Sequence, residues 1–276
     1  MGVFRMLIID GTYLIYKSYY RTKKLEKSIS IENETHFKRI VRNNFLKILA
    51  SVKNKFQTKF LFIAFDSDGK NFRNDLLPSY KAHRKEKPPE LEGIKLEIYQ
   101  FLKSNHFCFQ IAENVEADDL IASYIESNPN ERISVYTGDG DLAALVNQNV
   151  RLLLDKGKKI QEITIQNFHH FFAVPPSLFA DYKALQGDKS DNVKGVDGLF
   201  RTEAIHLLLE YHTIANYFTS GEDHYLYSKL LQFRDKVLIN QKVTSLKKDC
   251  SLTFKKEQAK IESITIPRNL ERKIGW

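Results

Sequence analysis

The chain has 276 residues and a mass of 32.1 kDa, which is enough for a large buried core. Its 42% hydrophobic and 28% charged residues, with 12 Gly and 7 Pro, exclude collagen-like, disordered and low-complexity classes. The net charge of +8 favours a polyanionic partner such as nucleic acid, although it also aids solubility.

Short apolar runs alternate with helical periodicity along the first two thirds of the chain. Strands are expected at 6–9, 60–65, 107–111, 133–136 and 150–154, of which 107–111 is the weakest. Apolar residues at helical spacing predict helices within 37–52 and 91–102. This alternation predicts an α/β fold with a largely parallel central sheet flanked by helices.

Two further regions depart from this alternation. Residues 69–90 form a basic excursion punctuated by glycine and proline, and 178–185 and 202–211 predict two helices joined by a glycine-bearing turn. We expect an α/β core over 1–175, with an arch segment at about 69–105, and a helical region over 176–276 packed on that core. Residues 240–276 carry nine basic and four acidic side chains, typical of a solvated tail.

Three predicted strands end in an aspartate, namely Asp10, Asp66 and Asp139. A single aspartate in this position is usually a helix N-cap. The carboxyl ends of parallel strands meet at one edge of the sheet, so three such residues are expected to converge there.

Six more acidic residues extend the cluster: Glu116, Asp118, Asp119, Asp141, Asp188 and Asp191. Crowded carboxylates repel one another unless cations or protons intervene. Oxygen-only ligands suit Mg²⁺ or Mn²⁺. Nine carboxylates exceed what one Mg²⁺ ion can use, which predicts two ions acting on a phosphate.

The two cysteines, Cys108 and Cys250, are too few for a disulfide framework or a closed zinc site. The first residues lack the apolar core of a signal peptide, and no run is long enough to span a bilayer. We therefore expect a cytoplasmic protein with no membrane partner.

Six short motifs together resemble the 5′ nuclease (flap endonuclease) family. This family includes the 5′-3′ exonuclease domain of bacterial DNA polymerase I and stand-alone bacteriophage enzymes. The motifs occur in the family's order, at 7–12, 65–66, 77–84, 116–119, 137–141 and 187–192. The resemblance implies a helical arch over the active site and a helix-three-turn-helix at about 178–211 that grips duplex DNA.

The resemblance also implies roles for the residues that match each motif. Five would form a first metal site and four a second: Asp10, Asp66, Glu116, Asp118 and Asp119, then Asp139, Asp141, Asp188 and Asp191. Lys81 and Arg84 match a basic pair that neutralises the scissile phosphate. Tyr80 is expected to stack on a base, and Lys85 and Lys87 to contact the DNA backbone.

The chain departs from the family pattern after Asn192, where the family's hairpin has glycine and lysine at the positions of Phe200 and Thr202. Gly195, Gly198 and Arg201 remain expected DNA-binding residues, and the resemblance allows a K⁺ ion near this turn. The substitution of Phe200 for glycine puts the grip on duplex DNA at this turn in question.

The function implied is that of a monomeric, Mg²⁺-dependent 5′-3′ exonuclease or flap endonuclease that leaves 5′-phosphates. Its expected partners are DNA 5′ ends, flaps and nicks, with RNA primer strands as a further substrate. Two alternatives are a metal-independent DNA-structure binding module and a haloacid dehalogenase-type phosphatase. The phosphatase needs a nucleophilic aspartate at the position of Ile8.

Overall fold

A computed structural model describes residues 4–26 and 33–264. Its centre is a six-stranded sheet in the order β3-β2-β1-β4-β5-β6, in which β6 alone is antiparallel to its neighbour. The strands are β1 (Met6–Asp10), β2 (Phe60–Phe65), β3 (Phe109–Ile111), β4 (Ile133–Thr137), β5 (Val150–Asp155) and β6 (Ile160–Ile163). The predicted largely parallel α/β sheet is thus confirmed.

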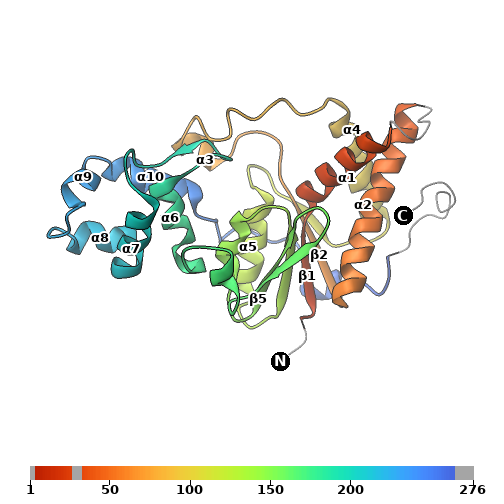
Figure 1. The fold of residues 1–276 in the computed structure, drawn as a ribbon. Coiled ribbons are helices and arrows are strands. Elements are labelled where there is room, and N and C mark those ends of the chain that lie inside the picture. The colour runs from red at the N-terminus through yellow and green to blue at the C-terminus, as the bar shows by residue number, and fades with distance from the viewer. Residues whose placement is uncertain (1–3, 27–32, 265–276) are drawn as a thin grey trace.

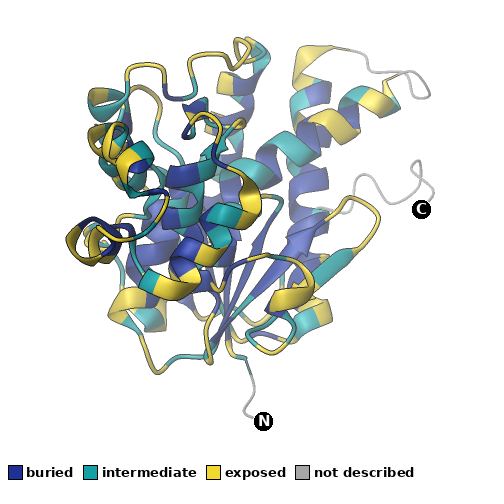
Figure 2. Cartoon of the chain, turned by 60° about the vertical axis from the view of Figure 1, so that its left-hand side comes forward, coloured by how far each residue is buried: buried dark blue, intermediate teal, exposed yellow. Residues whose placement is uncertain are grey.

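Helices cover both faces of the sheet, so alternate residues of each strand enter different core clusters. Leu7 and Ile9 pack with α1 (Gly11–Leu25), α2 (Glu34–Phe56) and α4 (Glu90–Ser104). Met6 and Ile8 face α5 (Ala117–Ser127) on the other side. Figure 1 shows these two layers, and Figure 2 shows the buried strands between helices with exposed outer sides. Burial on both faces explains why β1 is continuously apolar before Asp10.

The C-terminal third is mainly helical and continues the core cluster on the α5 face. Its helices are α6 (Phe179–Gln186), α7 (Arg201–Tyr211), α8 (Ile214–Ser220), α9 (Tyr227–Leu231) and α10 (Arg234–Thr244). A short antiparallel pair of strands, β7 (Gly187–Asp188) and β8 (Val193–Lys194), separates α6 from α7. The two predicted helices and their turn are therefore present, whereas α1, β6 and α8 to α10 were not predicted. Single 3₁₀ turns occur at Asp141–Leu145, Phe168–His170, Pro176–Leu178 and Lys256–Ala259.

The arch segment is helical only at its ends. The short helix α3 (Phe72–Leu76) begins it and α4 ends it, while residues 77–89 form turns and irregular chain. Figure 1 shows this stretch crossing above the carboxyl ends of the strands. Pro78, Pro88 and Pro89 explain the missing helix, because proline lacks a backbone donor and restricts the residue before it.

The basic C-terminal segment returns to the core instead of extending into solvent as a tail. After α10 it runs back to the amino end of β2, where the Ile261 amide donates to the Lys59 carbonyl at 3.0 Å. The Phe254 ring packs on Phe62 with centroids 4.5 Å apart. Residues 265–276, which include three of the basic side chains, lie outside the described residues. Within the described ranges, none of the helices is both long and apolar enough to cross a bilayer.

Candidate metal and active site

Asp10 is the last residue of β1, and Asp66 follows β2, so both lie at the carboxyl edge of the sheet. Asp10 caps α1 by accepting the Tyr13 amide at 2.9 Å, while its other oxygen accepts the Thr137 hydroxyl at 2.7 Å. Asp66 accepts the amide of Ala117, the first residue of α5, at 2.7 Å. Asp10 is therefore an N-cap as well as a member of the acidic cluster.

Glu116 immediately precedes α5 and is surrounded by donors from the base of the arch. Its carboxylate receives the Lys81 ammonium at 2.7 Å, the Asn71 amide at 3.0 Å and the Tyr80 hydroxyl at 3.1 Å. Lys81 has a φ of +55°, which is uncommon for a residue other than glycine. Its amide donates to the Asp191 carbonyl at 3.0 Å, which ties the arch to the loop after α6. These contacts aim the Lys81 side chain at the acidic cluster.

Asp141, Asp188 and Asp191 form a second group on the side of the helical region. Each offers a carboxylate oxygen, and these oxygens lie within 4.8 Å of one another. The Lys183 ammonium bridges Asp141 and Asp188, and Arg84 donates to Asp191 at 2.8 Å. Such a set can hold one hard divalent cation.

A cavity of about 30 Å³ lies between the two groups, which is space for a few water-sized or ion-sized particles. Asp10 and Asp66 lie next to Asp118, close enough for their carboxylates to raise its pKa. The acidic and basic side chains that line the cavity are Glu116, Asp118, Asp139, Asp141, Asp188, Asp191, Arg73, Lys81 and Lys183. Apart from Asp119, the predicted acidic residues therefore converge.

Burial and mutual repulsion oppose ionisation of four carboxyls in the metal-free site. Burial, followed by the Asp66 charge, raises the pKa of Asp10 to about 7. Burial and the Asp139 charge similarly raise the pKa of Asp141 to about 7. Burial also raises the pKa of Asp66 and, with help from Asp139, that of Asp118. Nearby cations would relieve this repulsion, which is the electrostatic property expected of a metal site.

The pKa values of Glu116 and Asp188 are lowered instead, because lysines contact their carboxylates. Burial alone would raise the pKa of each, but Lys81 and Arg73 lower the pKa of Glu116. Hydrogen bonds from Lys183 and Ser190 likewise outweigh burial and lower the pKa of Asp188 to about 2. The chain's own lysines thus neutralise part of the acidic cluster.

Asp119 differs from the expectation that it ligates a metal ion. Its two oxygens accept both terminal nitrogens of Arg73 at 2.7 Å, and one also accepts the Lys247 amide at 2.8 Å. The side chain is 1% exposed and does not line the cavity. Asp119 therefore holds Arg73 instead of pointing into the site.

Tyr80 also differs from the expectation that it stacks on a base. The residue is 4% exposed, and its hydroxyl donates to Glu116. Lys85 and Lys87 are exposed on the arch as expected, with Lys87 paired to Asp68 at 2.8 Å.

Two basic residues that line the cavity, Arg73 and Lys183, were not predicted. Lys183 lies in the last turn of the predicted helix 178–185, five residues before Asp188, so its closeness to Asp188 in the sequence could have suggested it. No sequence signal identifies Arg73, since its partners Asp119 and Val243 are distant in the chain.

The hairpin that joins β8 to α7 (residues 194–200) has glycine at two positions where its backbone requires it. Gly198 has a φ of +69°, and a Cβ atom on Gly195 would lie 2.5 Å from the Gln186 carbonyl oxygen. Phe200 has a φ of −72°, so glycine is not needed there, and its ring is 70% exposed. Arg201 begins α7 and is also exposed.

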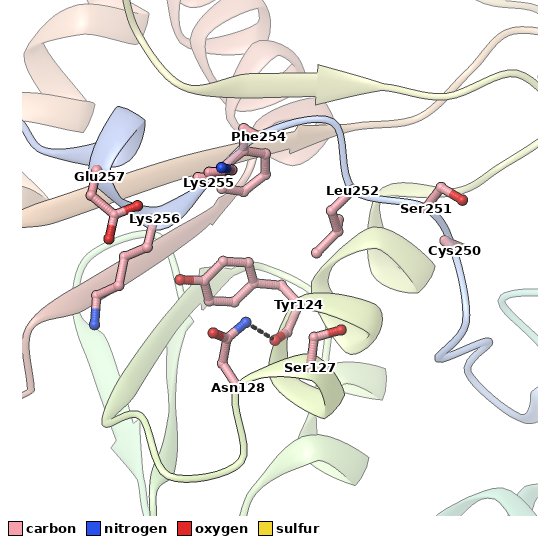
Figure 3. A pocket seen from close by; sticks show the side chains of 10 residues that line it. All are labelled: Tyr124, Ser127, Asn128, Cys250, Ser251, Leu252, Phe254, Lys255, Lys256 and Glu257. Atoms are coloured by element: carbon pink, nitrogen blue, oxygen red, sulfur yellow. Dashed lines mark hydrogen bonds between the residues drawn. The ribbon is translucent and has the colours of Figure 1, made fainter.

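A larger hollow of about 540 Å³ lies away from the acidic cluster, between α5 and the returning C-terminal segment. Figure 3 shows Lys255 and Lys256 on one side, and Tyr124 and Asn128 on the other. Lys256 also forms an ion pair with Glu131. The charges in this hollow are mixed and form no convergent group.

The fold and the acidic cluster define an α/β protein with an oxygen-ligand site for hard cations at the carboxyl edge of its sheet. Residues 5–173 match the 5′-3′ exonuclease N-terminal resolvase-like domain, and residues 174–266 match the 5′-3′ exonuclease C-terminal SAM fold. The chain belongs to the 5′-3′ exonuclease family.

Individual relatives agree with this assignment. A 5′-3′ exonuclease of Mycoplasmopsis pulmonis is 31% identical over 92% of this chain and 84% of its own. The Bacillus subtilis 5′-3′ exonuclease is 33% identical over 76% of this chain and 71% of its own. A zinc-bound T5 5′-exonuclease shares the fold, with a TM-score of 0.67 at 17% identity over 88% of this chain and 90% of its own. The bacteriophage T5 flap endonuclease in complex with DNA and metal ions gives the same TM-score at 19% identity, over 88% and 89% of the two chains.

Proposed function

We propose that this protein is a structure-specific 5′ nuclease that hydrolyses DNA phosphodiesters with two divalent metal ions and leaves 5′-phosphates. The observation that carries this proposal is the convergence of eight carboxylates from separate segments at one edge of the sheet, beneath a basic arch. The names of the relatives, 5′-3′ exonuclease and flap endonuclease, support the same activity.

The residues fit a pair of Mg²⁺ or Mn²⁺ ions, because the ligand set is crowded and contains only oxygen. Bound ions of this kind activate a water molecule and stabilise the leaving 3′ oxygen. We assign one ion to Asp10, Asp66, Glu116 and Asp118, and the other to Asp139, Asp141, Asp188 and Asp191. Asp119 is a positioning residue, since it holds Arg73 within 3.4 Å of Glu116.

Lys81 and Arg84 lie at the base of the arch, beside Glu116 and Asp191. Both are placed to donate to a scissile phosphate that enters the cavity and to neutralise the charge that develops there. The Lys81 side chain is less exposed than that of Arg84, at 24% against 53%. We therefore assign Lys81 the larger part in catalysis and Arg84 the larger part in binding.

The substrates we propose are DNA 5′ ends, flaps and nicks, with RNA primer strands as a further class. The irregular arch with Lys85 and Lys87 would contact the single strand, and the hairpin with Arg201 the duplex. Contacts of this kind read backbone shape and charge, so we expect cleavage to depend on structure rather than sequence. We expect a monomer acting in the cytoplasm during DNA replication or repair.

The phosphatase alternative is disfavoured by the place of Ile8. This residue stands where the nucleophile would be and is fully buried within β1. A metal-independent binding module is disfavoured as well, because eight converging carboxylates repel one another and such a module would bind no metal ions to offset that repulsion.

The test is cleavage of a 5′-labelled flap duplex with Mg²⁺ and with EDTA. We expect cleavage with Mg²⁺ only, and a loss of about 100-fold or more in turnover for Asp139→Ala and Asp188→Ala. Asp249→Ala, which removes an exposed carboxylate outside the cluster, is the control and should behave as wild type. Binding without cleavage, or hydrolysis of small phosphate esters alone, would refute the proposal.

A further inference from the structure

The hairpin between β8 and α7 has its backbone carbonyls bound by side chains from other elements. The Lys236 ammonium donates to the Gly195 carbonyl at 2.7 Å, and the Lys229 ammonium donates to the Gly198 carbonyl. Side-chain amides bind two more carbonyls. The amide of Asn240 donates to the Lys194 carbonyl at 2.9 Å, and that of Gln186 donates to the Leu199 carbonyl at 3.2 Å. Two of the four carbonyl contacts therefore come from positive charges.

The residues that donate to these carbonyls lie on α6, α9 and α10. Lys236 and Asn240 are four residues apart on α10 and so lie on the same side of that helix. Asn240 is 2% exposed and also donates to the Ala184 carbonyl of α6 at 3.0 Å. Lys229 reaches the same hairpin from α9. The helices α9 and α10, which no sequence motif predicted, thus set the position of the turn.

The two carbonyls bound by lysine belong to the two glycines that the turn requires. A Cβ atom on Gly195 would clash with the backbone of α6, and Gly198 has a positive φ. The carbonyl oxygens are consequently fixed by backbone geometry, and Lys229 approaches within 3.3 Å of the Cβ position of Gly198. Substituting the lysines would change what these oxygens bind without changing the glycines.

A monovalent metal ion at this turn would compete with the lysines for the same oxygens. Carbonyl oxygens attract K⁺ and ammonium alike, but two unit positive charges that share one carbonyl oxygen repel each other. The residues around this turn therefore do not fit the K⁺ ion that the family resemblance allowed.

We propose that Lys229 and Lys236 replace a monovalent metal ion at this hairpin, so that binding of duplex DNA by this protein is independent of K⁺. The part that concerns DNA rests on the proposed function. The lysines are positioning residues: they hold the turn that presents the exposed Phe200 and Arg201 to the duplex.

The first test does not involve DNA and uses Tl⁺ as a heavy probe for K⁺ sites. Crystals of the wild-type protein soaked in a thallium salt should show no anomalous peak in contact with the carbonyl oxygens of Gly195 and Gly198. Crystals of the Lys229→Met/Lys236→Met double variant should show one. A peak at these oxygens in the wild type, or none in the double variant, would overturn the proposal.

The second test measures affinity for a nicked duplex in EDTA, in potassium chloride and in tetramethylammonium chloride at equal ionic strength. The wild-type affinity should differ by less than about twofold between the salts, because the ionic screening is the same. The double variant should lose about tenfold in tetramethylammonium and recover part of it in potassium, as expected when charge-assisted hydrogen bonds are lost and an ion replaces them.

Lys194→Met is the matched control, because Lys194 is an exposed lysine of the same hairpin whose side chain binds none of these carbonyls. It should weaken binding equally in both salts. Equal losses in both salts for the double variant would overturn the proposal, since they would indicate direct phosphate contacts alone. Failure of the wild type to bind DNA in either salt would refute the proposed function, and the thallium result would still decide the part that concerns the hairpin.

Discussion

Lysines within the acidic cluster have two different relations to the carboxylates. Lys183 bridges Asp141 and Asp188 from within α6 and lies between oxygens that we assign to one metal ion. Lys81 contacts Glu116 from the arch, with a backbone conformation that costs free energy outside glycine. Strain retained at a charged residue that faces the cavity supports a functional role for Lys81.

At the scale of single residues, we predict that Lys81→Ala lowers kcat by about 100-fold and weakens substrate binding by less than about threefold. The reason is that its ammonium is aimed into the cavity, where charge develops in the transition state. Single-turnover cleavage and anisotropy titration of a 5′ flap measure the two quantities. Lys85→Ala, which removes an exposed lysine of the arch, should weaken substrate binding more than it lowers kcat. Equal losses of binding and turnover for Lys81→Ala would contradict the assignment.

The raised pKa values of Asp10 and Asp141 predict how the stability of the metal-free protein varies with pH. Both are about 7 in the folded chain against an ordinary value of 3.8, so folding favours the protonated carboxyls. Their contribution is fully present below about pH 4 and is lost as the pH rises through 7. The lowered pKa of Asp188 acts in the opposite direction, but only below about pH 4.

We therefore expect the Tm in EDTA to fall between about pH 5 and pH 8, and Mg²⁺ to raise it most at the upper end, where the ligands are deprotonated. Calorimetry of the wild type and of Asp141→Asn measures the effect, and the variant should show a shallower decline. Asp249→Asn is the control and should follow the wild type. A Tm in EDTA that rises over this range would contradict the argument.

At the scale of elements, α3 is attached to the core through the buried side chain of Arg73. Arg73 is 2% exposed and joins Asp119 of α5 to the carbonyls of Val243 and Ser245 at the end of α10. One guanidinium group thus connects the base of the arch, the α/β core and the helical region. Breaking a buried pair of this kind leaves an uncompensated charge.

We predict that Arg73→Met lowers the free energy of unfolding by about 3–5 kcal/mol. Urea titration followed by circular dichroism measures the change. The double variant Arg73→Met/Asp119→Leu should recover part of the loss, because it removes the unpaired carboxylate as well. An unchanged urea midpoint for Arg73→Met would show that the pair does not stabilise the folded chain.

The parts of this structure that could be predicted from sequence are those with local signals. Apolar runs ending in Asp10, Asp66 and Asp139 indicated both the sheet and the edge where ligands gather. Asp119 could not be separated from Asp118, because the difference depends on Arg73, a residue 46 positions away. The lysines that bind the hairpin carbonyls are similarly distant from the hairpin in the sequence, since Lys229 is 31 positions from Gly198. Contacts made by long side chains across the fold leave no periodic pattern.

At the scale of the whole molecule, the basic C-terminal segment begins beside the acidic cluster, where Thr244 and Leu246 line the cavity, and its later part, residues 254–261, lies at the opposite edge of the sheet. The helix α5 begins beside the cluster and ends after 11 residues near the hollow in Figure 3. The backbones of Lys260 and Phe60 form an antiparallel β-bridge at the amino end of β2. Residues 254–261, which include Lys255, Lys256 and Lys260, are therefore placed to stabilise the core and not to contact a substrate at the carboxyl edge.

We predict that Lys255→Ala/Lys256→Ala leaves flap affinity within about twofold of wild type, because screening limits the effect of charges far from the DNA path. Phe254→Ala should instead lower the free energy of unfolding by about 2 kcal/mol, since its partly buried ring packs on Phe62 and Tyr124. Anisotropy titration and urea denaturation separate the two effects. A large loss of affinity in the lysine variant would place the DNA path across the amino edge of the sheet and contradict a structural role for this segment.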